Sequence, residues 1–271
     1  MSKKIDQQAF VKLVQSKLSE KELNWLKKKS AILTIPESIG KFPIFFSLTA
    51  RFIANEIPLW EEDELEQLET VYPGFGKASW TKQELVRVVL MINLETSKNK
   101  KILEAFFETA EMQELVAFFK GLFLLENAEE FTLSVEEGIR TNMVNVFDSF
   151  TAGNPYAITY LEEWAWNQLV LKALFLDRPL FTIHDIDKRK NQSLSEMLQD
   201  FVNERWSAFR EVSPEIWRMI EGNLRDDIRK RISERERKGI EKEAIDHVLH
   251  TDKNEKALEF WNNIGKLNLK K

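Results

Sequence analysis

Apolar side chains recur three and four positions apart along almost the whole chain, while alternation of apolar and polar residues with period two is nearly absent. The first spacing places apolar residues on one face of an α-helix, so the sequence predicts an all-α protein. The expected helices follow one another with short connections, which favours serial antiparallel helix pairs. These could form a HEAT- or armadillo-like α-solenoid or an irregular helical bundle. No repeat of fixed period is visible that would decide between the two.

Several expected helix starts carry Ser or Thr followed three positions later by Glu, which is the sequence pattern of a capping box. These pairs are Ser19 with Glu22, Thr81 with Glu84, Ser134 with Glu137, and Ser193 with Glu196. A helix is expected roughly over 37–53, and Pro43 must either lie in its first turn, where proline is tolerated, or kink it. Further along, the periodicity predicts continuous helices over 136–152 and 157–177, followed by a third helix that contains Phe201 and Arg205.

Polar side chains occur on these last three helices at places where a helical core is normally aliphatic. Arg140 lies at the edge of the apolar stripe of helix 136–152. Helix 157–177 is apolar nearly all round, so Asn167 and Lys172 must find partners or line a cavity. Arg205 occupies a position of the third helix where the pattern predicts an apolar residue.

Two interpretations of these polar residues remain open. In the first, Arg140 or Arg205 pairs with an acidic residue in a buried network that joins helix to helix. The acidic candidates are Asp148, Asp200 and Glu204. In the second, an arginine binds an anionic group in a pocket with tryptophan walls. The candidate ligand-binding residues are Arg140, Asn142, Asn145, Trp164, Asn167, Lys172, Glu204, Arg205 and Trp206.

Composition narrows the classes of function. The chain has 271 residues, no cysteine and a formal net charge of -5 with interspersed signs. The charge pattern argues against a nucleic-acid partner, and the absence of cysteine fits a reducing compartment. No apolar window reaches the roughly 20 residues of a membrane span, and the N-terminus lacks the apolar core of a signal peptide. A cytoplasmic protein without a transmembrane segment is therefore expected.

Sequence motifs of catalysis are missing. There is no nucleophile elbow, phosphate loop, dinucleotide-binding glycine pattern or paired Glu-His motif for a di-iron site. His247 and His250 share a helical face with Glu243 at a spacing compatible with zinc, but their charged surroundings favour a solvated surface. We expect no metal and no cofactor, and the sequence leaves open whether the chain is an enzyme.

The composition changes abruptly after Gly222. From there the sequence carries dense, alternating charge with a sparse apolar stripe, and the apolar residues Leu258, Trp261, Ile264 and Leu267 follow near its end. This change predicts a helical domain over 1–222 and a charged helical C-terminal extension over 223–271. The helices of the extension are expected to be exposed, stabilised by charge pairs at helical spacing and anchored by the four apolar residues.

A family resemblance follows from four segments that occur in order between Leu133 and Ile220: EGIRTNMVNVFDS, NPY, AWNQLVLKALF and NERWSAFREVSPEIWR. Together they resemble the EboA family, and weaker similarity continues upstream through FSLTARF and LVAFFKGLFLL. The charged C-terminal segment lies outside the resemblance. Family members often have His-Glu-Arg-Trp where this chain has Asn203, Glu204, Arg205 and Trp206, which argues against a required catalytic histidine there.

The resemblance implies an all-helical protein that is associated with a bacterial biosynthetic gene cluster. The cluster is linked to moving a secondary-metabolite precursor out of the cytoplasm. Other members of such a cluster resemble a prenyltransferase, a metal hydrolase, a dehydroquinate-synthase-like enzyme and a sugar-isomerase-like barrel. The expected function is an accessory or scaffold protein in biosynthesis or export of the metabolite, with enzymes of the cluster as partners. The alternative is an enzyme or binding protein that uses the tryptophan-lined pocket for a small anionic or aromatic metabolite.

Overall fold

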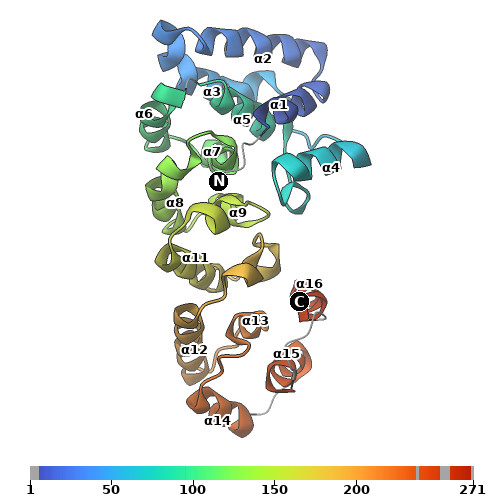
Figure 1. Ribbon diagram of the computed structural model, residues 1–271, viewed down its shortest axis with the longest axis vertical. Helices are drawn as coiled ribbons and strands as arrows, with labels where there is room; N and C mark the ends of the chain where they lie inside the picture. The colour runs from blue at the N-terminus through green and yellow to red at the C-terminus, as the bar shows by residue number, and fades with distance from the viewer. Residues whose placement is uncertain (1–5, 95, 236–237, 251–256, 270–271) are drawn as a thin grey trace. The chain divides into compact units, whose positions relative to one another are not determined.

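The computed structural model describes residues 6–94, 96–235, 238–250 and 257–269. Within these ranges the chain forms sixteen α-helices and several short 3-10 helices, and it contains no β-strand. The predicted all-α fold is therefore confirmed. The chain divides into two compact units, unit 1 with Met1–Leu161 and unit 2 with Glu162–Lys271 (Figure 1). The solenoid remains a prediction, because it concerns the stacking of helix pairs along the whole chain.

Unit 1 contains the first ten α-helices of the described residues. They are α1 (Gln7–Ser16), α2 (Glu20–Leu33), α3 (Phe42–Phe52), α4 (Glu62–Val71), α5 (Lys82–Ile92), α6 (Thr96–Phe107), α7 (Met112–Gly121), α8 (Thr132–Ile139), α9 (Val144–Thr151) and α10 (Tyr156–Tyr160). The 3-10 helices of this unit are η1 (Pro36–Lys41), η2 (Phe75–Lys77), η3 (Leu122–Leu124) and η4 (Ala128–Phe131).

Unit 2 contains the remaining described helices. They are α11 (Glu163–Phe175), η5 (Leu180–Thr182), η6 (Ile186–Arg189), α12 (Gln192–Ser207), α13 (Ile216–Ile220), α14 (Asp226–Glu234), α15 (Gly239–His250) and α16 (Ala257–Asn268). The boundary between the units lies at Leu161, whereas the sequence predicts a division after Gly222. The C-terminal helices α15 and α16 pack against α13 and η5 within unit 2.

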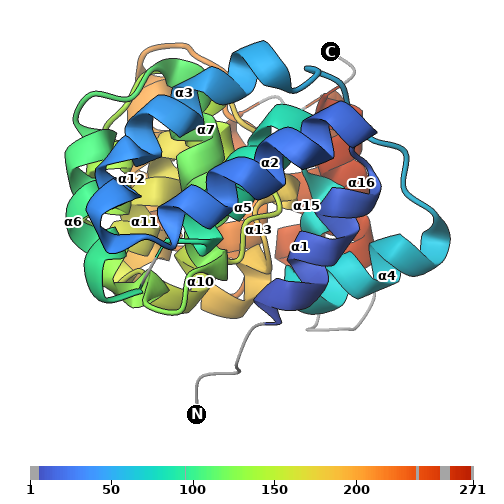
Figure 2. The ribbon, with the colours of Figure 1, turned by 90° about the horizontal axis from the view of Figure 1, so that it is seen from above.

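The centre of unit 1 is α7, which packs against α5 and α9 (Figure 1). Nearly every residue of α5 is buried, as expected for a helix that is apolar on almost all sides. In another part of the unit, helix α1 packs beside α4 (Figure 2). Gly138 lets α8 approach α7 closely, because a Cβ atom at this position would lie 2.7 Å from Cζ of Phe119.

Two of the predicted capping boxes are confirmed. The Glu22 carboxylate accepts the Ser19 N–H at 2.8 Å at the start of α2, and Glu84 accepts the Thr81 N–H at 2.8 Å at the start of α5. Each box satisfies backbone donors that the first turn of a helix leaves unpaired. Pro43 lies in the first turn of α3, as expected, and the 3-10 helix η1 precedes it.

The predicted caps at Ser134 and Ser193 are wrong. Helix α8 already begins at Thr132, so Ser134 lies inside its first turn. Asn191 caps α12 instead of Ser193, because its side-chain oxygen accepts the Leu194 N–H at 2.8 Å. Asparagine caps a helix as well as serine does, and the capping-box pattern does not include it.

The two long helices predicted over 136–152 and 157–177 are each interrupted. The first is divided into α8 and α9, and the second into α10 and α11. At the second break Glu162 has an extended backbone and forms the N-cap of α11. Neither break interrupts the spacing of the apolar residues, so periodicity alone predicts a single helix in both places.

Arg218 joins three segments of unit 2 from a buried position. Its guanidinium donates to both carboxylate oxygens of Asp187, with Nε 2.8 Å from Oδ1. Nη1 also donates to Oδ1 of Asn262 on α16 at 3.2 Å. Burial alone would raise the pKa of Asp187, but the hydrogen bonds and charge of Arg218 lower it below its ordinary value. Arg218 therefore connects α13, η6 and α16.

Helix α16 packs closely on the rest of unit 2. A Cβ atom at Gly265 would lie 2.4 Å from Cδ1 of Phe181 and 2.8 Å from Oε1 of Glu215, so only glycine fits here. Of the anchors predicted for the extension, Trp261 and Ile264 are buried, while Leu258 and Leu267 are exposed. Helix α16 is therefore held by its buried face and by the hydrogen bond between Asn262 and Arg218 of α13.

Glu215 makes the stability of unit 2 depend on pH. Its carboxyl group is fully buried and accepts the N–H groups of Leu180 and Phe181 at 3.0 and 2.7 Å. Burial nevertheless raises the pKa of Glu215 from its ordinary 4.5 to about 7. The folded state thus binds this proton more tightly than the unfolded state. The resulting stabilisation is complete below pH 4.5 and is lost as the pH rises through about 7.

We expect Glu215→Gln to remove this pH dependence, because an amide keeps an acceptor and does not ionise. The measurement is the free energy of unfolding from urea melts at several pH values. Wild type should lose roughly 3 kcal/mol relative to the variant as the pH rises across this interval. Parallel curves for the two proteins would show that Glu215 does not titrate there.

Phe209 combines backbone strain with complete exposure. It follows α12 in the left-handed conformation, with φ of 57°, and its side chain is 97% exposed. The Arg210 N–H donates to the Arg205 carbonyl at 2.9 Å, which closes the helix end in a turn that usually requires glycine.

Phe209→Gly is therefore expected to stabilise unit 2 by up to about 1 kcal/mol, because it relieves strain and removes no packing. Arg210→Gly is the control, since Arg210 is exposed and does not have a positive φ. Thermal melts compare the two variants. A loss of stability in Phe209→Gly would mean that the aromatic ring is not free of contacts.

Candidate functional site

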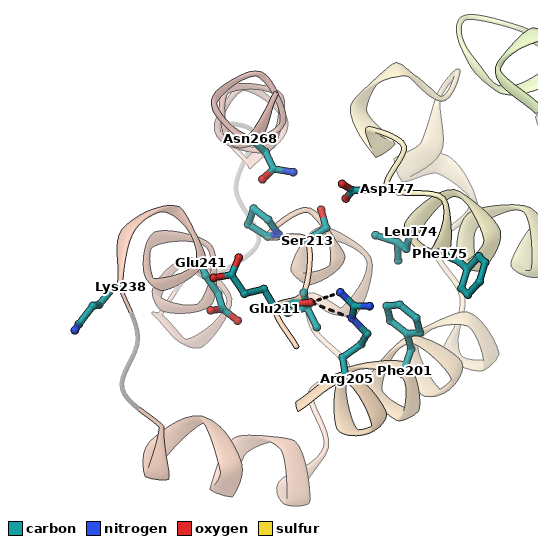
Figure 3. Close-up of a pocket in the computed structure, with 12 residues that line it drawn as sticks. Leu174, Phe175, Asp177, Phe201, Arg205, Glu211, Ser213, Lys238, Glu241 and Asn268 are labelled. Atoms are coloured by element: carbon teal, nitrogen blue, oxygen red, sulfur yellow. Dashed lines mark hydrogen bonds between the residues drawn. The ribbon is translucent and has the colours of Figure 1, made fainter. Parts of the chain in front are cut away.

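A hollow of about 490 Å³ opens in unit 2 where α11 and α12 meet the segment before α13 and the C-terminal helices (Figure 3). Its size suits a small organic molecule. The lining residues are Leu174, Phe175, Asp177, Phe201, Arg205, Glu211, Val212, Ser213, Pro214, Lys238, Glu241 and Asn268.

The guanidinium of Arg205 is held in a fixed orientation at this hollow. Its Nε and Nη2 donate to the Glu211 carbonyl oxygen at 3.0 and 2.8 Å, which fixes the plane of the guanidinium (Figure 3). Phe201, one turn earlier on α12, lies under the group, with the guanidinium carbon 5.9 Å from the ring centroid. Nη1 donates no hydrogen bond within the described part of the chain. Arg205 thus has a fixed orientation and free donors.

Carboxylates line the hollow opposite this cation. Asp177 follows α11 in the left-handed conformation, with φ of 56°, and Glu211 belongs to the loop after α12. Neither carboxylate forms an ion pair within the residues that the structure describes. Leu174, Val212 and Pro214 supply apolar wall. The hollow therefore offers donors, acceptors and an apolar surface together.

The C-terminal helices contribute to the same wall. Lys238 and Glu241 come from the start of α15, and Asn268 ends α16. The segment that the sequence predicts as a charged extension therefore completes the hollow instead of standing apart from it.

The residues predicted to form a ligand site are divided between the two units. Arg140, Asn142 and Asn145 belong to unit 1, and all three are exposed. The sequence predicts Arg140 at the edge of a buried stripe, but Arg140 caps the C-terminus of α8, because the helix ends there. Asn145 lies on α9 beside two smaller hollows of unit 1.

The other predicted residues belong to unit 2, and only Arg205 lines the hollow described above. Trp164 is 55% exposed, and Glu204 is exposed. Lys172 lies over the Phe175 ring at 5.5 Å from its centroid. Being next to Arg205 in sequence does not bring Glu204 to the hollow, because consecutive helical residues point in different directions.

Asn167 and Trp206 are buried but have structural partners. The Asn167 amide exchanges hydrogen bonds with the amide of Asn191 at 3.2 and 2.9 Å. The Trp206 ring packs against Trp217 with 5.8 Å between centroids, and the Arg235 guanidinium lies 4.6 Å from the Trp206 ring. The predicted network of arginine, acid and amide groups is therefore replaced in unit 2 by separate pairs.

The sequence interpretation missed two buried cations in unit 1. Arg87 on α5 and Lys120 on α7 are 3% and 8% exposed. The signal was present, since Arg87 interrupts a helix that is otherwise apolar on nearly every side. The same reasoning that selected Lys172 on a helix of this kind would have selected Arg87.

No group of three or more metal-ligating side chains is found among the described residues. His247 stacks on Phe260 with ring centroids 3.9 Å apart, and its Nε2 lies 3.5 Å from Oε1 of Glu221. The side chain of His250, the other residue of the predicted pair, lies outside the described residues. Across the described ranges, no helix has the length and apolar content that a membrane span requires.

Comparison with known protein families gives a match over most of the chain. The family model described as metabolite traffic protein EboA matches residues 7–221, which include unit 1 and unit 2 as far as the end of α13. The match stops before α14, so the helices α14 to α16 lie beyond it. No curated protein matches the chain, and no solved structure does.

Proposed function

This chain belongs to the EboA family, and on that premise we propose that it is an accessory protein of metabolite traffic that binds a small zwitterionic metabolite in the hollow of unit 2. The observation that carries the proposal is the hollow itself, where the fixed guanidinium of Arg205 faces the same space as the carboxylates of Asp177 and Glu211. A ligand with both charges would satisfy both sides. The family description, metabolite traffic protein, agrees with binding and transfer of a small molecule.

The chemistry of the walls suggests how the ligand would lie. Its carboxylate would accept hydrogen bonds from Nη1 of Arg205, which is held in place by the Glu211 carbonyl. Its ammonium group would face Asp177, and its apolar part would lie on Leu174 and Val212. A ligand with several negative charges fits less well, because carboxylates outnumber Arg205 on these walls.

A role in the cell can be tested in a strain that lacks this chain. Complementation with wild type should restore the normal metabolite profile, while Arg205→Gln should leave the same intermediate accumulated as in the deletion. Arg210→Gln is the matched control, because Arg210 is exposed at the same helix end and does not line the hollow. Full restoration by Arg205→Gln would count against the hollow as the functional site.

A second candidate function is docking of a partner protein, such as an enzyme of the same pathway. It is favoured by exposed apolar side chains, above all Phe209 and, in the segment after α3, Leu59, which is 89% exposed. A strained, fully exposed phenylalanine is costly for an isolated chain. If docking is the function, Phe209→Gly should weaken capture of the pathway enzymes in pull-down experiments, although the variant itself is stable.

A further inference from the structure

Unit 1 contains a groove that is separate from the hollow of unit 2. Two adjoining hollows of about 230 and 300 Å³ lie along α5, α7 and α9 and have Thr81, Glu84, Val116 and Asn145 in common. We call this pair the α5–α9 groove. All its lining residues belong to unit 1, so it is independent of the function proposed above.

Arg87 lines this groove from an almost fully buried position. It is 3% exposed, with Nε donating to the Phe46 carbonyl at 3.2 Å and Nη1 to the Gln113 carbonyl at 3.4 Å. Nη2 donates no hydrogen bond within the described residues. Burial lowers the pKa of Arg87, and nearby acids including Glu114 oppose this effect. A buried guanidinium with unused donors beside a cavity is a favourable place for an anionic group.

Lys120 adds a second cation at the other end of the groove. Its Nζ donates to the Ser79 carbonyl at 2.6 Å and to Oε2 of Glu84 at 3.0 Å, and it lies 4.9 Å from the centroid of the Trp80 ring. Burial lowers the pKa of Lys120, while the Glu84 carboxylate opposes this effect. Both cations are therefore held in place by backbone carbonyls before any ligand binds.

The acids near these cations already have donors. Oε2 of Glu84 accepts the Thr81 N–H as well as the Lys120 ammonium. Glu114 accepts the Ser47 hydroxyl at 2.5 Å and the Glu111 N–H at 3.0 Å. These carboxylates remain charged, and Asp148 lines the Lys120 end of the groove as well. They would repel a ligand with several negative charges, so a single carboxylate fits best at the Arg87 end, which Asp148 does not line.

The remaining walls combine apolar and polar side chains, with Gln83 and Gln113 near Arg87 and with Lys77 and Asp148 near Lys120. Met112 and Val116 supply apolar surface from α7, and Ala78 and Ala152 extend it along the groove. Asn145 is exposed where the two hollows meet, and its amide forms no hydrogen bond within the described part of the chain. A cleft that offers apolar surface together with convergent polar groups suits a small molecule.

We propose that the α5–α9 groove binds a small monocarboxylate with an apolar body. The carboxylate accepts hydrogen bonds from Nη2 of Arg87 and from the amide of Asn145. The apolar body lies on Met112 and Val116. A cationic ligand is disfavoured beside Arg87, and a neutral ligand can accept the Nη2 hydrogen bond but lacks the attraction between opposite charges.

The test uses benzoate as the probe and the full-length chain, with binding followed by ¹⁵N–¹H spectra. Benzoate should shift amide signals of α5, α7 and α9, whereas benzamide, its neutral analogue, should do so only at a concentration at least about tenfold higher. Asn145→Asp places a negative charge at the exposed centre of the groove and should raise the Kd for benzoate at least about tenfold. The charge suits the first turn of α9, so the fold should be kept.

Asn142→Asp is the matched control, because Asn142 is exposed and lines neither hollow. It should change the benzoate affinity less than about twofold at physiological salt. The proposal is overturned if benzamide binds as well as benzoate, or if both Asp variants bind benzoate like wild type. Arg205→Gln should leave benzoate binding in the groove unchanged. A failure of the proposed benzoate site can therefore be told apart from a failure of the proposed zwitterion site in unit 2.

Discussion

Arg218→Leu is expected to destabilise unit 2 by roughly 3 kcal/mol, because removing one member of a buried ion pair leaves the other uncompensated. The Arg218 side chain is 2% exposed, while that of Asp187 keeps 29% exposure, which places the effect at the low end for buried pairs. The substitution also removes the hydrogen bond to Asn262. Hydrogen exchange of α13 and α16, together with urea melts, measures the loss.

Arg225→Leu is the control for this variant. Arg225 forms ion pairs as well, with Asp200 at 2.7 Å and with Asp227 at 2.8 Å. Its side chain is 31% exposed, however, and the side chains of both partners are more exposed than that. Exposed pairs of this kind contribute about 1 kcal/mol or less. Equal destabilisation by the two leucine variants would contradict the structural role assigned to Arg218.

The Arg218 variant should also change the response to acid. The pKa of Asp187 is lowered in the folded state, so this carboxylate stabilises unit 2 above its ordinary pKa of 3.8. That stabilisation is lost as the pH falls through the lowered value. Arg218→Leu should therefore flatten the acid limb of the stability curve of wild type.

Arg205→Gln is expected to weaken binding of L-phenylalanine, the probe for a zwitterion with an apolar side chain, by about tenfold to hundredfold. The glutamine keeps a donor for the Glu211 carbonyl but loses the charge and the free Nη1 donors. The fold should be retained, because Arg205 is only half-buried. Isothermal titration measures the Kd, and circular dichroism checks the fold.

Two comparisons make this prediction specific. Arg210→Gln should bind L-phenylalanine like wild type, since Arg210 does not line the hollow. Phenylacetate and phenethylamine each carry one of the two charges of the probe, and both should bind wild type more weakly than L-phenylalanine does. If either half binds as tightly as the whole, the hollow is not a zwitterion site.

The fold class could be predicted from the sequence because helical spacing continues through nearly every element. The capping boxes at Ser19 and Thr81 placed two helix starts correctly, since both side chains act locally. The breaks after Ile139 and before Glu162 could not be predicted, because no proline stands at either, Gly138 lies inside α8, and the apolar stripe resumes after each break.

The candidate site was predictable only in part, for the same reason. Arg205 was selected as a polar residue on an apolar face, and it does line the largest of the hollows described. Arg140 was selected by the same rule but is exposed, because the helix that was expected to bury it ends one residue earlier. Asp177 and Glu211 lie in connections, where sequence periodicity carries no information.

The C-terminal segment shows what composition can and cannot reveal. Its alternating charge begins after Gly222, and the match to the EboA family ends at residue 221. Composition did not indicate that α16 would be held by Asn262 and Gly265 against buried groups of unit 2. Those contacts are made to Phe181, Glu215 and Arg218, which lie far from α16 in sequence and come close to it only after folding.

The most direct test of the central claim is a titration of the ¹⁵N-labelled full-length chain with L-phenylalanine. The claim predicts saturable shifts of backbone amides beside the hollow, in the end of α11, the loop from Glu211 to Pro214 and the start of α15. These shifts should be strongly reduced in Arg205→Gln. Shifts that are absent, that lie elsewhere in the chain, or that persist unchanged in the variant would contradict a zwitterion site in unit 2.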